Sequence, residues 1–147
     1  MTLTRRVWES CVLKYLKKDL FKDMFRCLKC AKCCYETEMI LLKSDIARLK
    51  ALGYDLNKVA IKVNNYYQLR NINGHCVFLD EKTKLCKIYE HRPLGCRLYP
   101  IVIDIEELKV TVDSECPAAY TVTVEDIIKN RDLILKVLNE LREMNII

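Results

Sequence analysis

Four of the nine cysteines in this chain lie within eight residues, in the segment Cys27-Leu28-Lys29-Cys30-Ala31-Lys32-Cys33-Cys34. A hydrophobic core has no need for four thiols at this spacing, whereas thiolates bind zinc, copper(I) and iron–sulfur clusters. Four further cysteines follow one at a time. We therefore predict that eight cysteines bind metal: Cys27, Cys30, Cys33, Cys34, Cys76, Cys86, Cys96 and Cys116.

The chain of 147 residues, 51% of them hydrophobic, is long enough for one domain with a core of its own. Its charged N-terminal stretch lacks the uninterrupted apolar run of a secretory signal, and no run approaches the ~18 apolar residues of a membrane span. We expect a cytoplasmic protein with no membrane partner. In a reducing cytoplasm, cysteines bind metal or catalyse reactions more often than they form disulfides, although intracellular proteins of hyperthermophiles are an exception.

The formal net charge of +5 does not by itself indicate a nucleic-acid partner, because bound metal would cancel most of it. Eight thiolates together with two centres of charge about +2 would bring the total to about +1. The Lys and Arg residues near the cysteines then neutralise anionic metal centres, and we expect no binding to nucleic acid.

The apolar spacing of the N-terminal third predicts helices within residues 3–26, which would lead directly into the cysteine segment. A short strand is expected over residues 39–42. A helix is expected over residues 45–52, with Ser44 as its N-cap and Gly53 where it stops.

Two hairpins are expected further along the chain, one within residues 76–89 and one within residues 101–112 that turns at Glu106-Glu107. Between them Pro93 opens a turn or short helix. A possible capping box of Thr123 with Asp126 predicts a C-terminal helix over residues 123–144. Its apolar face would be made of Ile127, Ile128, Ile134, Leu135, Leu138 and Leu141.

Together these elements predict a small α+β domain spanning residues 1–147. Its N-terminal helices (3–26) and C-terminal helix (123–144) would pack around short β-hairpins and metal-binding loops, which form a cysteine core over residues 27–118.

The tandem C-x2-C-x2-C of Cys27, Cys30 and Cys33 matches the first three ligands of a ferredoxin-type [4Fe–4S] site, whose fourth ligand is remote. Zinc sites more often use two separate C-x2-C pairs, and a second pair is absent here. Adjacent residues project in different directions, so Cys33 and Cys34 serve either two irons of one cluster or two centres. We expect one or two clusters per chain, most simply [4Fe–4S]: either two clusters, or one cluster together with one structural zinc. One large or unusual cluster, and zinc in place of iron, are the alternatives.

Several neighbouring residues have weaker signals. Cys11 lies on an apolar helical face and is expected to be a buried core thiol. Arg92 and Arg97 flank Cys96, and we predict that they contact the cluster, where hydrogen bonds to sulfur tune its potential; surface ion pairs are the alternative. His75 and His91 lack a metal-ligand spacing. We expect His75 to be a surface residue, with a role as a ligand or beside the ligands as the alternative, and His91 to be a hydrogen-bonding or exposed residue.

The cysteine segment, Cys76-Val77-Phe78-Leu79 and the run Ile88-Tyr89-Glu90-His91-Arg92-Pro93 ending in Cys96-Arg97-Leu98-Tyr99-Pro100 resemble the CxxCxxCC, or YkgJ-type, cysteine-cluster family. The resemblance covers about residues 26–118. It implies a zinc- or iron-chelating protein that can contain an iron–sulfur cluster. A similar region occurs in flagellin lysine N-methylases. Ala31 departs from the family, in which Gly is frequent at this position, and Ala there is strained only if φ is positive.

Three functions follow from this pattern. The first is an iron–sulfur protein that transfers electrons for a partner protein or redox enzyme. The second is a structural zinc module that presents a surface to another protein. The third is a cluster-dependent enzyme subunit, for radical or methyl-transfer chemistry. The chain has only three glycines and contains no G-x-G-x-x-G loop. No P-loop or Ser-His-Asp set is visible either, so no catalytic residue is assigned.

Overall fold

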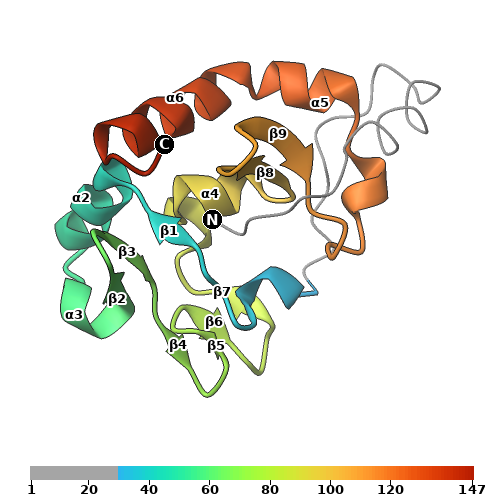
Figure 1. The fold of residues 1–147 in the computed structure, drawn as a ribbon. Coiled ribbons are helices and arrows are strands. Elements are labelled where there is room, and N and C mark those ends of the chain that lie inside the picture. The colour runs from blue at the N-terminus through green and yellow to red at the C-terminus, as the bar shows by residue number, and fades with distance from the viewer. Residues whose placement is uncertain (1–29) are drawn as a thin grey trace.

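The computed structural model describes residues 30–147, so the predicted helices of residues 3–26, together with Cys11 and Cys27, lie outside the described residues. Figure 1 shows short helices and short strand pairs arranged beneath one long C-terminal helix. This arrangement confirms the α+β class. The sheets are small and antiparallel, so loops between them bring distant segments of the chain together.

One sheet has three strands in the order β1-β3-β2, and the other strands form the pairs β4-β5, β6-β7 and β8-β9. The strands are β1 (Ile40–Leu41), β2 (Ala60–Val63), β3 (Tyr66–Leu69), β4 (Asn71–Ile72), β5 (His75–Cys76), β6 (Leu79–Asp80), β7 (Leu85–Cys86), β8 (Ile101–Asp104) and β9 (Lys109–Val112). The helices are η1 (Lys32–Cys34), α2 (Lys43–Ala51), α3 (Leu56–Val59), η2 (Tyr89–His91), α4 (Leu94–Leu98), η3 (Ala119–Thr121), α5 (Val124–Lys129) and α6 (Arg131–Glu143).

Helix α2 begins two residues earlier than predicted, and Ser44 is not its N-cap. The N-cap is Leu42, whose backbone N–H donates to Asp45 Oδ2 at 2.9 Å. Ser44 lies inside the first turn, where its Oγ donates to Glu140 Oε2 at 2.7 Å and so joins α2 to α6. Gly53 follows the helix with φ +90°, a conformation that glycine adopts without steric cost and that ends the helix as predicted.

The predicted C-terminal helix is two helices, α5 and α6, which meet at Asn130. Thr123 and Asp126 cap α5 reciprocally: Thr123 Oγ1 accepts from the Asp126 N–H at 3.1 Å, and Asp126 Oδ2 accepts from the Thr123 N–H at 2.8 Å. Helix α6 buries Ile134, Val137 and Leu141 and thereby covers the core. Two members of the predicted apolar face are exposed instead: Ile128 and Leu135.

The predicted hairpin of residues 101–112 is confirmed by the pairing of β8 with β9. Asp104 Oδ1 accepts the backbone N–H groups of Glu106 and Glu107 at 3.0 Å each, and these bonds stabilise the turn. The hairpin of residues 76–89 is shorter than predicted. Leu79 pairs with Cys86, whereas Cys76 pairs with Asn71 in the separate β4-β5 sheet. Within residues 30–147, no helix has the length and apolar character needed to span a bilayer.

Candidate metal centre

All seven of the predicted ligands that the structure describes line one cavity of about 260 Å³. They come from separate parts of the fold, namely η1 and the residue pair before it, β5, β7, α4 and the loop after β9. The seven are Cys30, Cys33, Cys34, Cys76, Cys86, Cys96 and Cys116. The eighth predicted ligand, Cys27, lies outside the described residues but precedes Cys30 by only three positions.

The η1 turn places Cys33 and Cys34 at the cavity. Ala31 precedes it with φ +63°, and the Cys34 N–H donates to the Ala31 carbonyl at 2.8 Å. A left-handed backbone conformation costs an alanine roughly 1–2 kcal/mol, which explains why glycine suits this position. The Glu36 N–H then donates to the Gly74 carbonyl at 2.8 Å, so the segment after η1 lies against the β4-β5 hairpin that carries Cys76.

A buried carboxylate positions the short helix that carries Cys96. Asp45, fully buried in α2, accepts the backbone N–H of Leu94 through Oδ1 at 2.9 Å. Arg48 donates to the same Oδ1 at 2.7 Å and also to the carbonyls of His91 at 3.3 Å and Arg92 at 3.2 Å. This ion pair therefore attaches α2 to the segment that leads into α4.

Sequence reasoning assigned no such role to Asp45 or Arg48. The i,i+3 spacing of the two residues is visible in the sequence, but the partners in residues 91–94 are not. Burial raises the pKa of Asp45 above its usual value, although the two backbone N–H donors and Arg48 oppose this effect. The fold tolerates this buried carboxylate because its oxygens accept hydrogen bonds from two backbone N–H groups and from the Arg48 guanidinium.

The thiols at the cavity interact with one another. The Cys34 thiol donates a hydrogen bond to Cys33, which lowers the pKa of Cys33 from 9.0 to about 7, and the Arg92 charge lowers it further. The same hydrogen bond, together with burial, raises the pKa of Cys34. Burial is the main cause that raises the pKa of Cys76 to about 11 and the pKa values of Cys86 and Cys96 above the ordinary value.

A negative charge on Cys33 further raises the pKa values of four other thiols, those of Cys34, Cys76, Cys86 and Cys96. These five thiols therefore form one electrostatically interacting group. Thiolates held this close repel one another in the absence of a cation. A metal bound among them would displace their protons and relieve that repulsion.

Cys116 lines the cavity near Tyr99. The Tyr99 hydroxyl donates to Asp113 Oδ2 at 2.9 Å. Burial, followed by the Asp113 charge and with a smaller effect from Cys116, raises the pKa of Tyr99. The tyrosine therefore keeps its proton and remains a hydrogen-bond donor within the cavity wall.

Arg92 and Arg97 both line the cavity, but they do so differently. Arg92 is half-buried: its guanidinium lies 3.9 Å from the Tyr89 ring centroid and donates to the Tyr89 carbonyl at 2.7 Å. Its charge lowers the pKa values of Cys33 and Cys86. Arg97 is exposed, so only Arg92 has the partly buried placement expected of a charge partner.

His75 is buried, so the prediction of surface exposure is wrong. Its Nδ1 lies 3.0 Å from the Cys76 carbonyl oxygen, and its Nε2 lies 3.5 Å from Glu81 Oε1. The ring therefore lies against the strand that carries a predicted ligand. His91 is exposed, as predicted, and contributes its carbonyl to Arg48.

The ligand assignments remain predictions. None of the seven described cysteines forms a disulfide, and no three His, Cys, Asp or Glu side chains of residues 30–147 are arranged around one metal-ion position. The donor set itself fits a soft metal, because thiolates prefer zinc, copper(I) and iron–sulfur clusters to hard cations.

Residues 26–117 match the CxxCxxCC family model, described as "Putative zinc- or iron-chelating domain". The chain belongs to this family. The match confirms the resemblance seen in the sequence and covers the cysteine core between the N-terminal segment and α5. A member of the CxxCxxCC family is expected to chelate zinc or iron, and the cavity supplies thiols for either.

The chain is also 35% identical over 109 residues to an uncharacterized protein of the archaeon Methanocaldococcus jannaschii. The matched region is 67% of this chain and 58% of that relative, so the chain spans less than two thirds of the relative's length. No solved structure matches this CxxCxxCC protein.

Proposed function

We propose that the chain is a cytoplasmic iron–sulfur protein, which holds one or two clusters in the cysteine cavity and transfers electrons to a partner protein. The observation that supports this function is the convergence of seven cysteines from five segments on one cavity of about 260 Å³. One four-coordinate zinc takes only four thiolates, each at about 2.3 Å, and would leave the other thiols without a role.

The spacing of the cysteines supports the same proposal. Cys27, Cys30 and Cys33 have the spacing of the first three cluster ligands in bacterial ferredoxins, and the later cysteines are single, as a remote fourth ligand is. Cys33 and Cys34 both line the cavity, so adjacent thiols are available to two irons or to two centres. When bound, an iron–sulfur cluster supplies one-electron redox chemistry.

The protein's own residues would set the environment of that cluster. Arg92 brings a positive charge to the side of the cavity formed by Cys33 and Cys86. Tyr99 lines the same cavity with its hydroxyl donated to Asp113. Charge and hydrogen bonds near the sulfurs are the main ways in which a protein sets a cluster's reduction potential.

Anaerobic purification tests the proposal, with iron, zinc and acid-labile sulfide counted per chain and EPR spectra recorded after reduction. We expect a brown protein with about four or eight irons and a matching number of sulfides. A colourless protein with full zinc occupancy and no sulfide would instead support the structural zinc module.

Single Cys→Ser changes at the eight predicted positions identify the ligands. Each true ligand should lower iron per chain, and Cys11→Ser is the matched control because Cys11 is the one cysteine not assigned to metal. If one change leaves iron content intact but alters reactivity with added small ligands, an open iron and hence the enzyme-subunit alternative would be favoured.

A further inference from the structure

In the part of the chain that the structure describes, the charged side chains that line the cavity and face solvent are all positive. Lys32, Lys84 and Arg97 are exposed and Arg92 is half-buried; we call these four residues the basic rim. Among residues 30–147, the only acidic residue that lines the cavity is Asp126, which is buried and occupied in capping α5. A partner that approaches the cavity therefore meets positive charge.

Three of the four cations are too exposed to compensate buried thiolates strongly, because water screens exposed charges. The same charges act strongly on a protein that docks over them and excludes that water. Their exposed position thus fits recognition of an anionic partner better than neutralisation of the metal centre.

Exposed aromatic and apolar groups accompany the basic rim. Tyr89 is 41% exposed and stacks against Arg92, Leu85 is 43% exposed, and Tyr35 is 39% exposed with Lys84 donating to its hydroxyl. Tyr and Arg are the residues enriched at the centres of protein interfaces. The contacts of Arg92 with the Tyr89 ring and of Lys84 with Tyr35 also hold these cations in place before a partner binds, which lowers the entropic cost of binding.

In the sequence, the net positive charge is concentrated in residues 1–29, which lie outside the described residues. Residues 1–29 contain eight Lys or Arg and only three Asp or Glu, so they carry the whole formal net charge of +5, and residues 30–147 are neutral in total. This basic segment joins the described chain at Cys30, which itself lines the cavity.

We propose that the basic rim is the docking surface for an electron-carrier protein with an acidic face. The inference rests on the proposed electron-transfer function, because it places the partner over the cavity that would hold the cluster. Charge complementarity favours this partner, and small interfaces steered by charge are typical of redox encounters.

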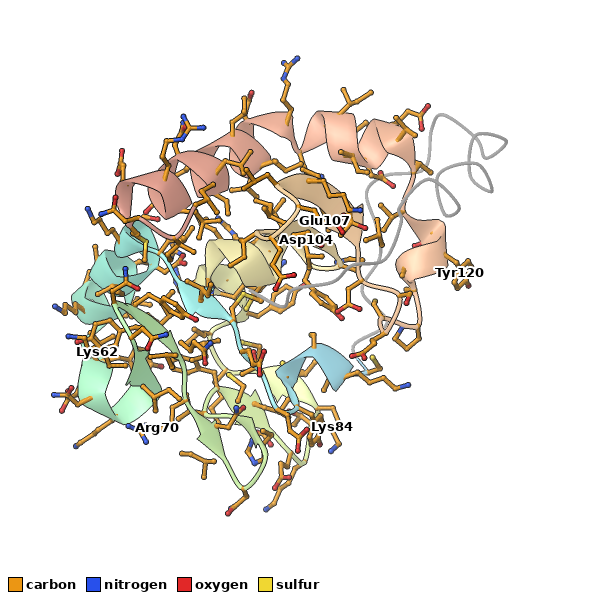
Figure 2. The ribbon with its side chains drawn as sticks, viewed as in Figure 1. Lys62, Arg70, Lys84, Asp104, Glu107 and Tyr120 are labelled. Carbon is orange, nitrogen blue, oxygen red and sulfur yellow. The ribbon has the colours of Figure 1, made fainter. Side chains whose placement is uncertain are left out.

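Lys84→Glu tests the rim, and Lys62→Glu is its matched control. Figure 2 shows Lys84 beside β7 and the blue η1 turn, whereas Lys62 projects at the opposite edge beside α3. Both lysines are exposed. Each substitution replaces a positive by a negative charge, so the two variants change the net charge equally. At an ionic strength of about 0.15 M the Debye length is about 8 Å, so only a nearby charge acts on a docked partner.

The probe is a plant-type [2Fe–2S] ferredoxin, a small acidic carrier, titrated into the metal-loaded full chain by calorimetry. We expect the ferredoxin to bind, Lys84→Glu to weaken binding by about 3- to 10-fold, and Lys62→Glu to change it less than about 2-fold. A basic cytochrome c should not bind.

Equal effects of the two variants, or equal binding of ferredoxin and cytochrome c, would overturn the proposal. So would tighter, Lys84-dependent binding to a single-stranded RNA or to anionic vesicles. Metal content is measured on every sample. Calorimetry measures binding without any redox change. A zinc-loaded chain would therefore refute the proposed electron-transfer function, whereas the docking surface is tested separately by the effects of the two lysine variants on ferredoxin binding.

Discussion

Removal of the Asp45 carboxylate should destabilise the fold and release the helix that carries Cys96. The two oxygens of Asp45 accept three hydrogen bonds, from the Leu42 N–H at 2.9 Å, the Leu94 N–H at 2.9 Å and Arg48 Nη2 at 2.7 Å. The side chain is fully buried, so water cannot replace the lost acceptor.

The magnitude follows from the groups left unpaired. A buried donor without a partner costs about 1–3 kcal/mol, and breaking a buried ion pair costs about 3–5 kcal/mol. These losses overlap because Arg48 keeps its two carbonyl acceptors and is partly exposed. We therefore expect Asp45→Ala to lower the free energy of unfolding by about 3–5 kcal/mol, a large share of the roughly 5–15 kcal/mol of a typical domain.

Urea unfolding of the anaerobic protein measures this loss, and metal per chain reports the effect on the site. Asp55→Ala is the matched control: Asp55 caps α3 by accepting the Asn57 N–H at 3.0 Å, but it is exposed. The control should cost about 1 kcal/mol or less and keep its metal. Asp45→Asn, which retains one acceptor oxygen, should fall between the two and remain measurable if Asp45→Ala does not fold.

The anchoring role of Asp45 would be refuted if Asp45→Ala cost no more than Asp55→Ala. It would also be refuted if the stability fell while metal per chain stayed at the parent value, because the Leu94 contact would then be irrelevant to the position of Cys96.

Three further predictions follow from single contacts. Ala31→Gly should raise the free energy of unfolding by about 0.5–1 kcal/mol in urea titrations, because the strain of φ +63° outweighs the added freedom of the unfolded chain; a loss of stability would contradict that account. In the reduced, metal-free protein, iodoacetamide should label Cys33 before Cys76 at pH 7, since their pKa values are about 7 and about 11 and only thiolate reacts. Mass spectrometry after digestion reads out the order, the Cys33 rate should rise with pH to a plateau above about pH 8, and Cys34→Ala should shift that rise to higher pH because it removes the hydrogen-bond donor. Leu141→Ala should cost about 2–5 kcal/mol because this α6 side chain is fully buried, whereas Leu135→Ala on the same helix, 50% exposed, should cost far less.

Features that depend on neighbours in the sequence could be predicted well. The hairpin of residues 101–112 and the reciprocal cap of Thr123 and Asp126 are both confirmed, because the bonds that form them join residues only a few positions apart. The cysteine segment and the motifs that follow it likewise indicated the family, since residue types and spacings are properties of the sequence, and the family match over residues 26–117 confirms it.

Errors arose where a distant residue competed with a local pattern. Ser44 has the chemistry of an N-cap, but it bonds instead to Glu140, 96 positions away. Cys76 was expected to lie in a hairpin with Cys86, yet it pairs with Asn71 in another sheet. The apolar periodicity continues through Asn130, but the helix does not.

The sequence by itself determined which groups are available for metal, namely the eight thiols predicted as ligands, four of them within eight residues, and it determined membership in a family described as zinc- or iron-chelating. Only the tertiary structure decided that seven of these thiols line a single cavity. It also decided that the buried Asp45 attaches α2 to α4 across 49 positions and that the exposed charged side chains among the described lining residues are positive. Such convergence depends on long-range packing and burial, and a list of residue spacings contains neither.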